Sequence, residues 1–160
     1  MAGARRRETG TQKGIAFTIR FASRADARSL ARLSTQLGYP STPGQVARRL
    51  SAIRHDKDHA VYVAEDLDAR IVGWVHVCLG RTVESDAEAE LGGLVVDENC
   101  RRGGVGRLLA ERAERWARGK SLKSVYVRSN IIRKDAHAFY QSLGYRLIKT
   151  QYAFRKFLKT

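Results

Sequence analysis

Cysteine, proline and methionine are scarce in this chain of 160 residues, which has two cysteines, two prolines and one methionine. Cys78 lies in an apolar run and Cys100 in a polar stretch, so no disulfide framework is implied. No apolar run approaches the roughly 18 residues of a membrane-spanning helix. This composition excludes a small disulfide-stapled domain and predicts a protein of the reducing cytoplasm, with no membrane partner.

The first fourteen residues lack the apolar segment of a secretory signal. They contain Arg5, Arg6 and Arg7 instead. We expect a disordered basic tail over residues 1–14, with an Arg-rich transit peptide as the alternative, and one folded domain over residues 15–160.

Acidic residues are few at the C-terminal end. Residues 100–160 carry sixteen basic and three acidic side chains, a net of +13, whereas residues 23–99 have a net charge of −3. The basic part suits a polyanionic ligand, either nucleic acid or a nucleotide cofactor with several phosphates. The acidic middle suits a cationic substrate.

Apolar periodicity and turn residues predict one mixed α/β sheet with flanking helices, in the order β-α-α-β-β-β-α-β-α-β-β. The step from the strand at 88–96 through a helix to the strand at 124–127 predicts a right-handed crossover. The expected strands are 17–21, 59–64, 70–79, 88–96, 124–127 and two within 145–157, and the expected helices are 26–37, 43–50, 104–118 and 135–143.

Paired glycines interrupt the strand expected at 88–96. Gly92 and Gly93 inside a strand indicate a β-bulge or a close approach of another group to the backbone. Simple alternation places Glu88, Glu90, Gly92 and Leu94 on one face of that strand.

A glycine-rich turn comes after the same strand and leads directly into a helix. Unpaired backbone N–H groups at a helix start, together with the helix dipole, form an anion site, and glycines let a phosphate approach closely. No Lys-Ser/Thr follows the last glycine, which excludes a P-loop, and Leu109 stands where the dinucleotide fingerprint has its third glycine. A plain turn with solvated arginines is the alternative.

The pattern Arg101-x-x-Gly104-x-Gly106 after an apolar strand resembles the cofactor motif of the GNAT family of N-acetyltransferases. Residues 94–96 resemble the family's splayed strand, and residues 136–145 resemble its last helix and the strand after it. The likeness covers residues 17–158. It implies a single N-acetyltransferase domain that uses acetyl-CoA as cosubstrate and transfers the acetyl group directly to a primary amine.

The resemblance also implies roles for individual residues. It supports Tyr140 as the group that protonates the departing thiolate, with a buried core tyrosine as the alternative. Apart from the resemblance, a backbone N–H of Val95 or Val96, next to the expected bulge, would stabilise the oxyanion. Glu90 is our candidate base, chosen from its position on the strand, with a solvated carboxylate as the alternative. The residues expected to bind the cofactor are Leu94, Val95, Val96, Arg101, Arg102, Gly103, Gly104, Val105, Gly106, Arg107, Asn130, Arg133, Ala136 and Tyr140.

Two positions depart from the common family pattern. Arg133 stands where many members have Asn, and residues 133–140 resemble the branch that contains aminoalkylphosphonate acetyltransferases. Gly93 stands where some relatives in that branch carry Glu, so a catalytic role for that Glu cannot be transferred.

The histidines give weaker signals. His55 and His59 are four residues apart in an expected loop, so no metal site is predicted there. His76 alternates with Trp74 and Cys78 and either lines the acceptor cleft or belongs to the core. We expect His137 to make a structural contact.

The favoured acceptor is a small-molecule amine, with protein N-termini or lysines as the second possibility. A basic nucleic-acid-binding module is the alternative from another class, and it is disfavoured because no aromatic-rich binding strand is present. A homodimer is left open.

Overall fold

The computed structural model describes residues 8–12 and 15–159. These residues fall into two units, the first ending at Arg128 and the second beginning at Ser129. The first unit contains β1 (Glu8–Gln12), β2 (Ile15–Phe21), η1 (Arg24–Asp26), α1 (Ala27–Gln36), α2 (Pro43–Ile53), β3 (His59–Glu65), β4 (Ile71–Gly80), β5 (Glu88–Val96), η2 (Glu98–Cys100), α3 (Val105–Gly119) and β6 (Val125–Val127). The second unit contains α4 (Lys134–Ser142).

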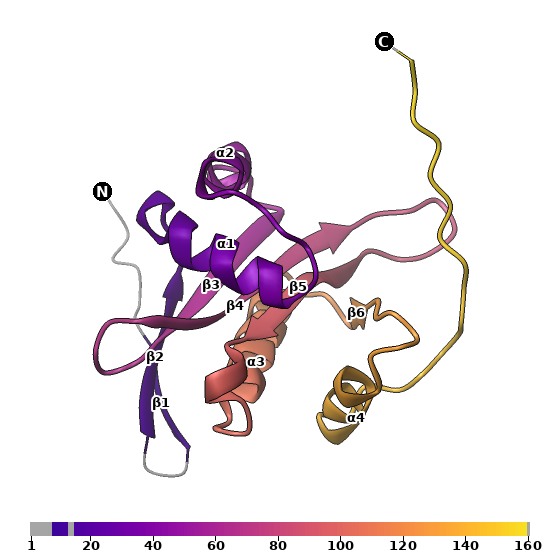
Figure 1. Cartoon of the computed structure of the whole chain (residues 1–160). Coiled ribbons are helices and arrows are strands. Elements are labelled where there is room, and N and C mark those ends of the chain that lie inside the picture. Colours follow the sequence, from indigo (N-terminus) through magenta and orange to yellow (C-terminus); the bar gives the residue numbers. More distant parts are fainter. Residues whose placement is uncertain (1–7, 13–14, 160) are drawn as a thin grey trace. The chain divides into compact units, whose positions relative to one another are not determined.

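One mixed sheet organises the first unit. Its six strands lie in the order β1-β2-β3-β4-β5-β6. Neighbours from β1 to β5 are antiparallel, whereas β5 and β6 are parallel and are joined through α3. The prediction of a mixed α/β sheet flanked by helices is therefore confirmed (Figure 1).

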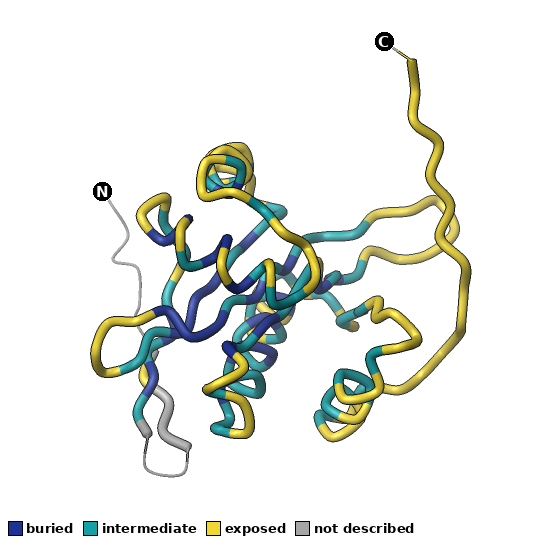
Figure 2. Tube along the Cα trace, in the orientation of Figure 1, coloured by how far each residue is buried: buried dark blue, intermediate teal, exposed yellow. Residues whose placement is uncertain are grey.

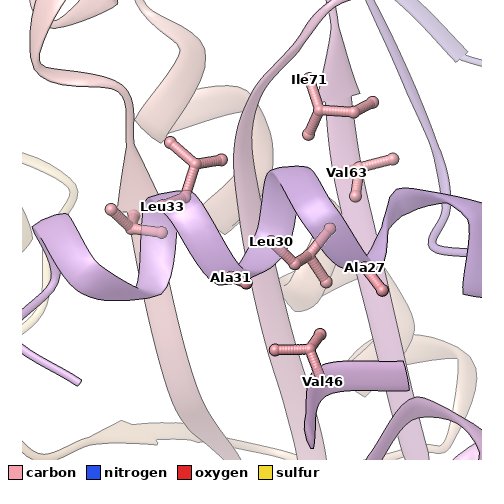
Figure 3. Close-up of a cluster of buried hydrophobic side chains, with 8 residues drawn as sticks. Ala27, Leu30, Ala31, Leu33, Val46, Val63 and Ile71 are labelled. Carbon is pink, nitrogen blue, oxygen red and sulfur yellow. The ribbon is translucent and has the colours of Figure 1, made fainter. Parts of the chain in front are cut away.

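The helices of this unit cover both faces of the sheet (Figure 1). On one face, α1 and α2 pack their apolar side chains against β3, β4 and β5 (Figure 3). On the other face, α3 lies so close to β4 that a Cβ added to Gly73 would meet Leu109 and Val105. The core on the first face consists of Ala27, Leu30, Ala31, Leu33, Val46, Val63, Ile71 and Val95.

Polar caps fix where α2 begins and where η1, the short helix that leads into α1, begins. Thr42 and Gln45 form a reciprocal capping box, and Pro43 occupies the first turn of α2. Ahead of α1, Asp26 accepts hydrogen bonds from the Ser23 backbone at 2.7 Å and from Arg20 at 2.8 and 2.9 Å. Since Asp26 is buried, these bonds replace the water that its carboxylate loses.

Two predictions of secondary structure are wrong. Residues 8–12, expected in a disordered tail, form β1, because β2 offers them an antiparallel partner. The rest of the expected tail, residues 1–7 and 13–14, lies outside the described residues.

The prediction of two strands within residues 145–157 is wrong, since residues 145–159 contain no strand. Figure 2 shows residues 146–159 as exposed. Among the described residues, no helix combines the length and the apolar character needed to cross a bilayer.

Candidate active site

A β-bulge at Gly92 divides β5 into two registers. His76 pairs with Gly93 and Val77 pairs with Leu91, so Gly92 has no direct partner on β4. The bulge predicted from the paired glycines is confirmed. Because it adds one residue, alternation reverses there, and Leu94 shares the face of Val75 rather than that of Glu90. The expectation that Glu90 and Leu94 share a face is therefore wrong.

Both glycines of the bulge are approached closely by side chains of β4. A Cβ added to Gly92 would lie 2.8 Å from His76 Nδ1, and one added to Gly93 would lie 2.8 Å from the Trp74 ring. No other residue type fits at these two positions without displacing an aromatic ring.

Beyond the bulge, one edge of β5 is not covered by β6. The parallel pairing joins Ala89, Glu90 and Leu91 to β6 and stops there. The Asp97 N–H bonds the Val72 carbonyl of β4, so alternation turns the Val95 amide toward β4 and the amides of Leu94 and Val96 away from it. Of the two oxyanion donors considered from the sequence, Val96 thus points its N–H away from the β4 ladder.

The glycine-rich turn connects this edge of β5 to α3. Gly104 has φ 84°, a left-handed conformation that favours glycine, and it is the N-cap of α3. The first intrahelical bond runs from the Leu108 N–H to the Gly104 carbonyl at 3.1 Å. The amides of Val105, Gly106 and Arg107 therefore have no acceptor within the helix. Arg101 and Arg102 are exposed beside them.

Helix α1 holds the start of this turn in place. Arg32 donates to the carboxylate of Asp97, and the Glu98 N–H donates to Gln36 Oε1 at 3.0 Å. The bond from Arg32, more than the opposing effect of burial, holds the pKa of Asp97 below its usual range. This anchor was not predicted, since residues some 60 positions apart meet only in the folded chain.

Glu90, the candidate base, forms an ion pair with Arg128 at the end of β6. Its side chain remains 24% exposed. Two residues earlier, Glu88 accepts a hydrogen bond from Ser124 at 3.0 Å. Sequence reasoning missed Arg128, because the register of a parallel pair is not visible in the residue pattern.

The second unit presents the other candidate residues around α4. Asn130 Oδ1 accepts a bond from the Ile132 N–H at 3.1 Å, and the Asn130 carbonyl lies 3.0 Å from His137 Nε2. His137 thus makes the structural contact expected of it. Arg133 is the N-cap of α4, and Ala136 lies in its first turn.

The C-terminal end of α4 fixes the ring of Tyr140. Gly144 has φ 91°, and the amides of Gly144 and Tyr145 return to the carbonyls of Gln141 and Tyr140 in a Schellman motif. The Tyr140 ring contacts the rings of Phe139 and Tyr145 at centroid distances of 5.1 and 5.5 Å. Burial raises the pKa of Tyr140 against the opposing effect of Arg133. The phenol is therefore protonated at neutral pH and can donate a proton.

The features of the first unit suit an anionic, extended ligand. Phosphates can bind the amides at the start of α3 and the arginines around it. An amide-containing chain can bond to the uncovered edge of β5. Cys100, beside the turn, is a protonated thiol, because burial and then Asp97 raise its pKa.

Comparison with known proteins agrees with this geometry. Residues 25–145 match the model of the acetyltransferase (GNAT) family. An uncharacterized N-acetyltransferase of Bacillus subtilis is 41% identical over 64 residues, which span 39% of this chain and 44% of that protein. This chain thus matches less than half the length of that relative.

Solved structures share the fold. An aminoglycoside 6'-N-acetyltransferase from Acinetobacter haemolyticus aligns with a TM-score of 0.75 at 20% identity, over 88% of this chain and 99% of that one. Glucosamine-6-phosphate N-acetyltransferase from Arabidopsis thaliana aligns with a TM-score of 0.74 at 20% identity, over 87% and 97% of the two chains.

Proposed function

The chain belongs to the acetyltransferase (GNAT) family, and from that premise we propose that it moves an acetyl group from acetyl-CoA to a primary amine of a small molecule. The observation that carries the proposal is the left-handed Gly104 turn, which opens the start of α3 beside the uncovered edge of β5. Family members use acetyl-CoA as cosubstrate, and these two features match its pyrophosphate and its pantetheine arm.

Each part of the first-unit site has a task in this proposal. The amides of Val105, Gly106 and Arg107, with the side chains of Arg101, Arg102 and Arg107, bind the phosphates, while Gly103 and Gly104 leave them room. Leu94, Val95 and Val96 form the strand along which the pantetheine arm lies. From the second unit, Asn130, Arg133, Ala136 and Tyr140 are assigned to the cofactor through the family motif.

Acetyl-CoA supplies an activated acetyl group, and the chain supplies the groups that handle charge and protons. The Val96 N–H donates to the oxygen on which negative charge develops. Tyr140, a protonated phenol, gives its proton to the departing sulfur. Glu90 takes the proton of the acceptor's ammonium group, through water, when the acceptor replaces Arg128 beside its carboxylate.

A small-molecule acceptor is supported by two observations. Two relatives of the same fold are named for acetylating an aminoglycoside and an amino sugar phosphate. The connection between β4 and β5 carries the exposed carboxylates of Glu84 and Asp86, which favour a cationic amine. Protein N-termini and lysines are the second acceptor class, and the aminoalkylphosphonate branch stays a prediction.

The proposal is tested by identifying the product. The full chain is incubated with acetyl-CoA and a panel of polyamines, aminoglycosides, amino sugars, aminophosphonates and peptides, and the products are read by mass spectrometry. One acetyl group on an amine of a small molecule is expected. Acetylation of peptides alone would move the assignment to the protein-directed class.

A basic nucleic-acid-binding module is the alternative from another class, because residues 100–160 are strongly basic. A salt-dependent RNA shift assay beside an acetyl-CoA titration separates the two. The acetyltransferase proposal requires binding of acetyl-CoA, whereas tight RNA binding without acetyl-CoA binding would favour a nucleic-acid-binding module.

A further inference from the structure

Three side chains with metal-binding atoms gather on the sheet face that α1 and α2 cover. His59 of β3 and Cys78 of β4 are direct partners across the two strands, and His76 lies two residues before Cys78 on the same face. One ligand atom from each of the three residues lies within 4.8 Å of the others. No step of the proposed acetyl transfer uses these residues.

The two imidazoles already stand at nearly the spacing of metal ligands. His59 Nδ1 lies 3.0 Å from His76 Nε2. With Zn–N about 2.0–2.1 Å and Zn–S about 2.3 Å, neighbouring ligands of a tetrahedral zinc site lie roughly 3.3–3.6 Å apart. A small outward turn of the rings and an approach of the Cys78 thiol would complete three corners of such a tetrahedron.

The surroundings favour this use of the histidines. When His59 Nδ1 faces the metal, its Nε2 is left to donate toward Asp56 Oδ2, which lies 3.8 Å away. A carboxylate behind a ligating histidine is the usual outer-shell partner. His76 is neutral, as a ligand must be, because burial and then the neighbouring His59 lower its pKa to about 4. On its other side the His76 ring is held against Gly92.

We propose that His59, His76 and Cys78 bind one divalent transition-metal ion, with zinc as the best match to two imidazoles and one thiolate. Binding displaces the proton of the Cys78 thiol to water, since burial keeps the pKa of that thiol above its usual value. Three protein ligands leave a fourth position for water or a small anion. His59 also lines a cleft of about 470 Å³ between α2 and the end of β2, which gives an ion a path of entry.

The site is independent of the acetyltransferase proposal, so its test does not depend on turnover. Tag-free full-length protein is stripped with a chelator and titrated with Co²⁺, whose bond to a thiolate gives an intense near-ultraviolet charge-transfer band. Zn²⁺ is then titrated by calorimetry. We expect one equivalent of either ion, the cobalt–thiolate band, and a higher melting temperature in zinc.

Matched variants locate the ion. Cys78→Ser should abolish the charge-transfer band, whereas Cys100→Ser, the other free cysteine, should keep it. His76→Gln should weaken zinc binding and His55→Gln should not. Asp56→Asn should cost about tenfold in zinc affinity, the lower end of an outer-shell effect. Cys78→Ser replaces only the sulfur atom by oxygen, so the variant is expected to keep the fold. Circular dichroism checks that it does.

The proposal is overturned if folded wild-type protein shows no cobalt–thiolate band, in which case the two histidines form only a hydrogen bond with each other. It is also overturned if Cys78→Ser keeps the band or if it binds zinc as tightly as Cys100→Ser does.

Discussion

Gly92 faces His76 so closely that a Cβ on Gly92 would lie 2.8 Å from His76 Nδ1. The contact occurs where β5 bulges, between the pairs His76–Gly93 and Val77–Leu91. The bulge turns Leu94 to the α3 face and leaves Glu90 on the face of His76 and Cys78. One glycine therefore sets which side chains of β5 face each layer of helices.

Gly92→Ala should destabilise the fold by about 1–3 kcal/mol, because the new methyl group must push aside a ring held by His59. Urea unfolding measures the change. Gly119→Ala is the matched control, since a Cβ there meets nothing within 4 Å, and it should be neutral or stabilising by up to about 1 kcal/mol. Equal stability of Gly92→Ala and the wild type would mean that the ring is not fixed against the bulge.

The ion pair between Arg20 and Asp26 should make stability depend on acid pH. Burial alone would raise the pKa of Asp26, but hydrogen bonds from Arg20 and Ser23 outweigh it and hold that pKa below its usual range. A depressed native pKa means that the contribution is complete above the unfolded value of about 3.9 and is lost as the pH falls through the native value.

Asp26→Asn should therefore lose about 1–3 kcal/mol of unfolding free energy at neutral pH. The difference from wild type should shrink as the pH falls below about 5. Urea unfolding across this pH range measures both. Asp68→Asn, whose side chain is 79% exposed, is the control and should behave as wild type. A difference that stays constant down to low pH would show that charge is not what Asp26 contributes.

Arg102→Ala and Arg107→Ala should each weaken acetyl-CoA binding about threefold to tenfold, because each removes a partly solvated charge beside the phosphates. These arginines are a cleaner test than Gly104, whose φ of 84° makes any substitution strain the fold itself. Arg118→Ala, at the far end of α3 and paired with Glu114, should have no effect.

Calorimetry measures the affinity of each variant for acetyl-CoA in low and in high salt. Salt should weaken binding to the wild type, because exposed charges are screened beyond about 8–10 Å at physiological ionic strength. If the affinity for acetyl-CoA does not change with salt and is equal in all three variants, the arginines do not act on its phosphates. The excess of basic residues would then serve another partner such as RNA.

Glu90→Gln should slow acetyl transfer most at low pH, where the acceptor amine is protonated and needs a base. The deficit should shrink as the pH rises, because more acceptor is already neutral. Glu88→Gln, two residues earlier on the same face, is the control, since Glu88 is occupied by Ser124. The measurement is the initial rate of acetyl transfer from acid to alkaline pH. A deficit that does not depend on pH would show that Glu90 is not the base and acts only through its ion pair with Arg128.

The sequence allowed most elements and the bulge itself to be predicted, because turn residues and apolar periodicity are local signals. The structural consequences of the bulge could not be predicted in the same way. The reversed face of Leu94, the outward amide of Val96 and the pairing of Glu90 with Arg128 depend on strand register. Register is set by contacts between residues far apart in the chain.

The remaining errors have the same origin. Alternating apolar residues over 145–157 are typical of strands, yet a strand needs a neighbour to accept its hydrogen bonds. Conversely, the polar residues of β1 give no strand pattern and pair because β2 lies beside them. The sequence pattern gives no reason to connect His59 with His76, and only the antiparallel pairing of β3 and β4 brings them within 3.0 Å.

The most direct test of the account is a continuous assay of thiol release from acetyl-CoA in the presence of an amine that the product screen has identified. Wild type should release thiol only when the amine is present. Tyr140→Phe should lower kcat by roughly 10²–10⁴ while acetyl-CoA affinity stays the same, because the lost bond forms in the transition state. Tyr39→Phe, an exposed tyrosine, should match wild type. Folded, cofactor-bound Tyr140→Phe that keeps the wild-type kcat with chemistry limiting the rate would contradict the role of Tyr140, and wild type without amine-dependent thiol release would contradict the proposed activity.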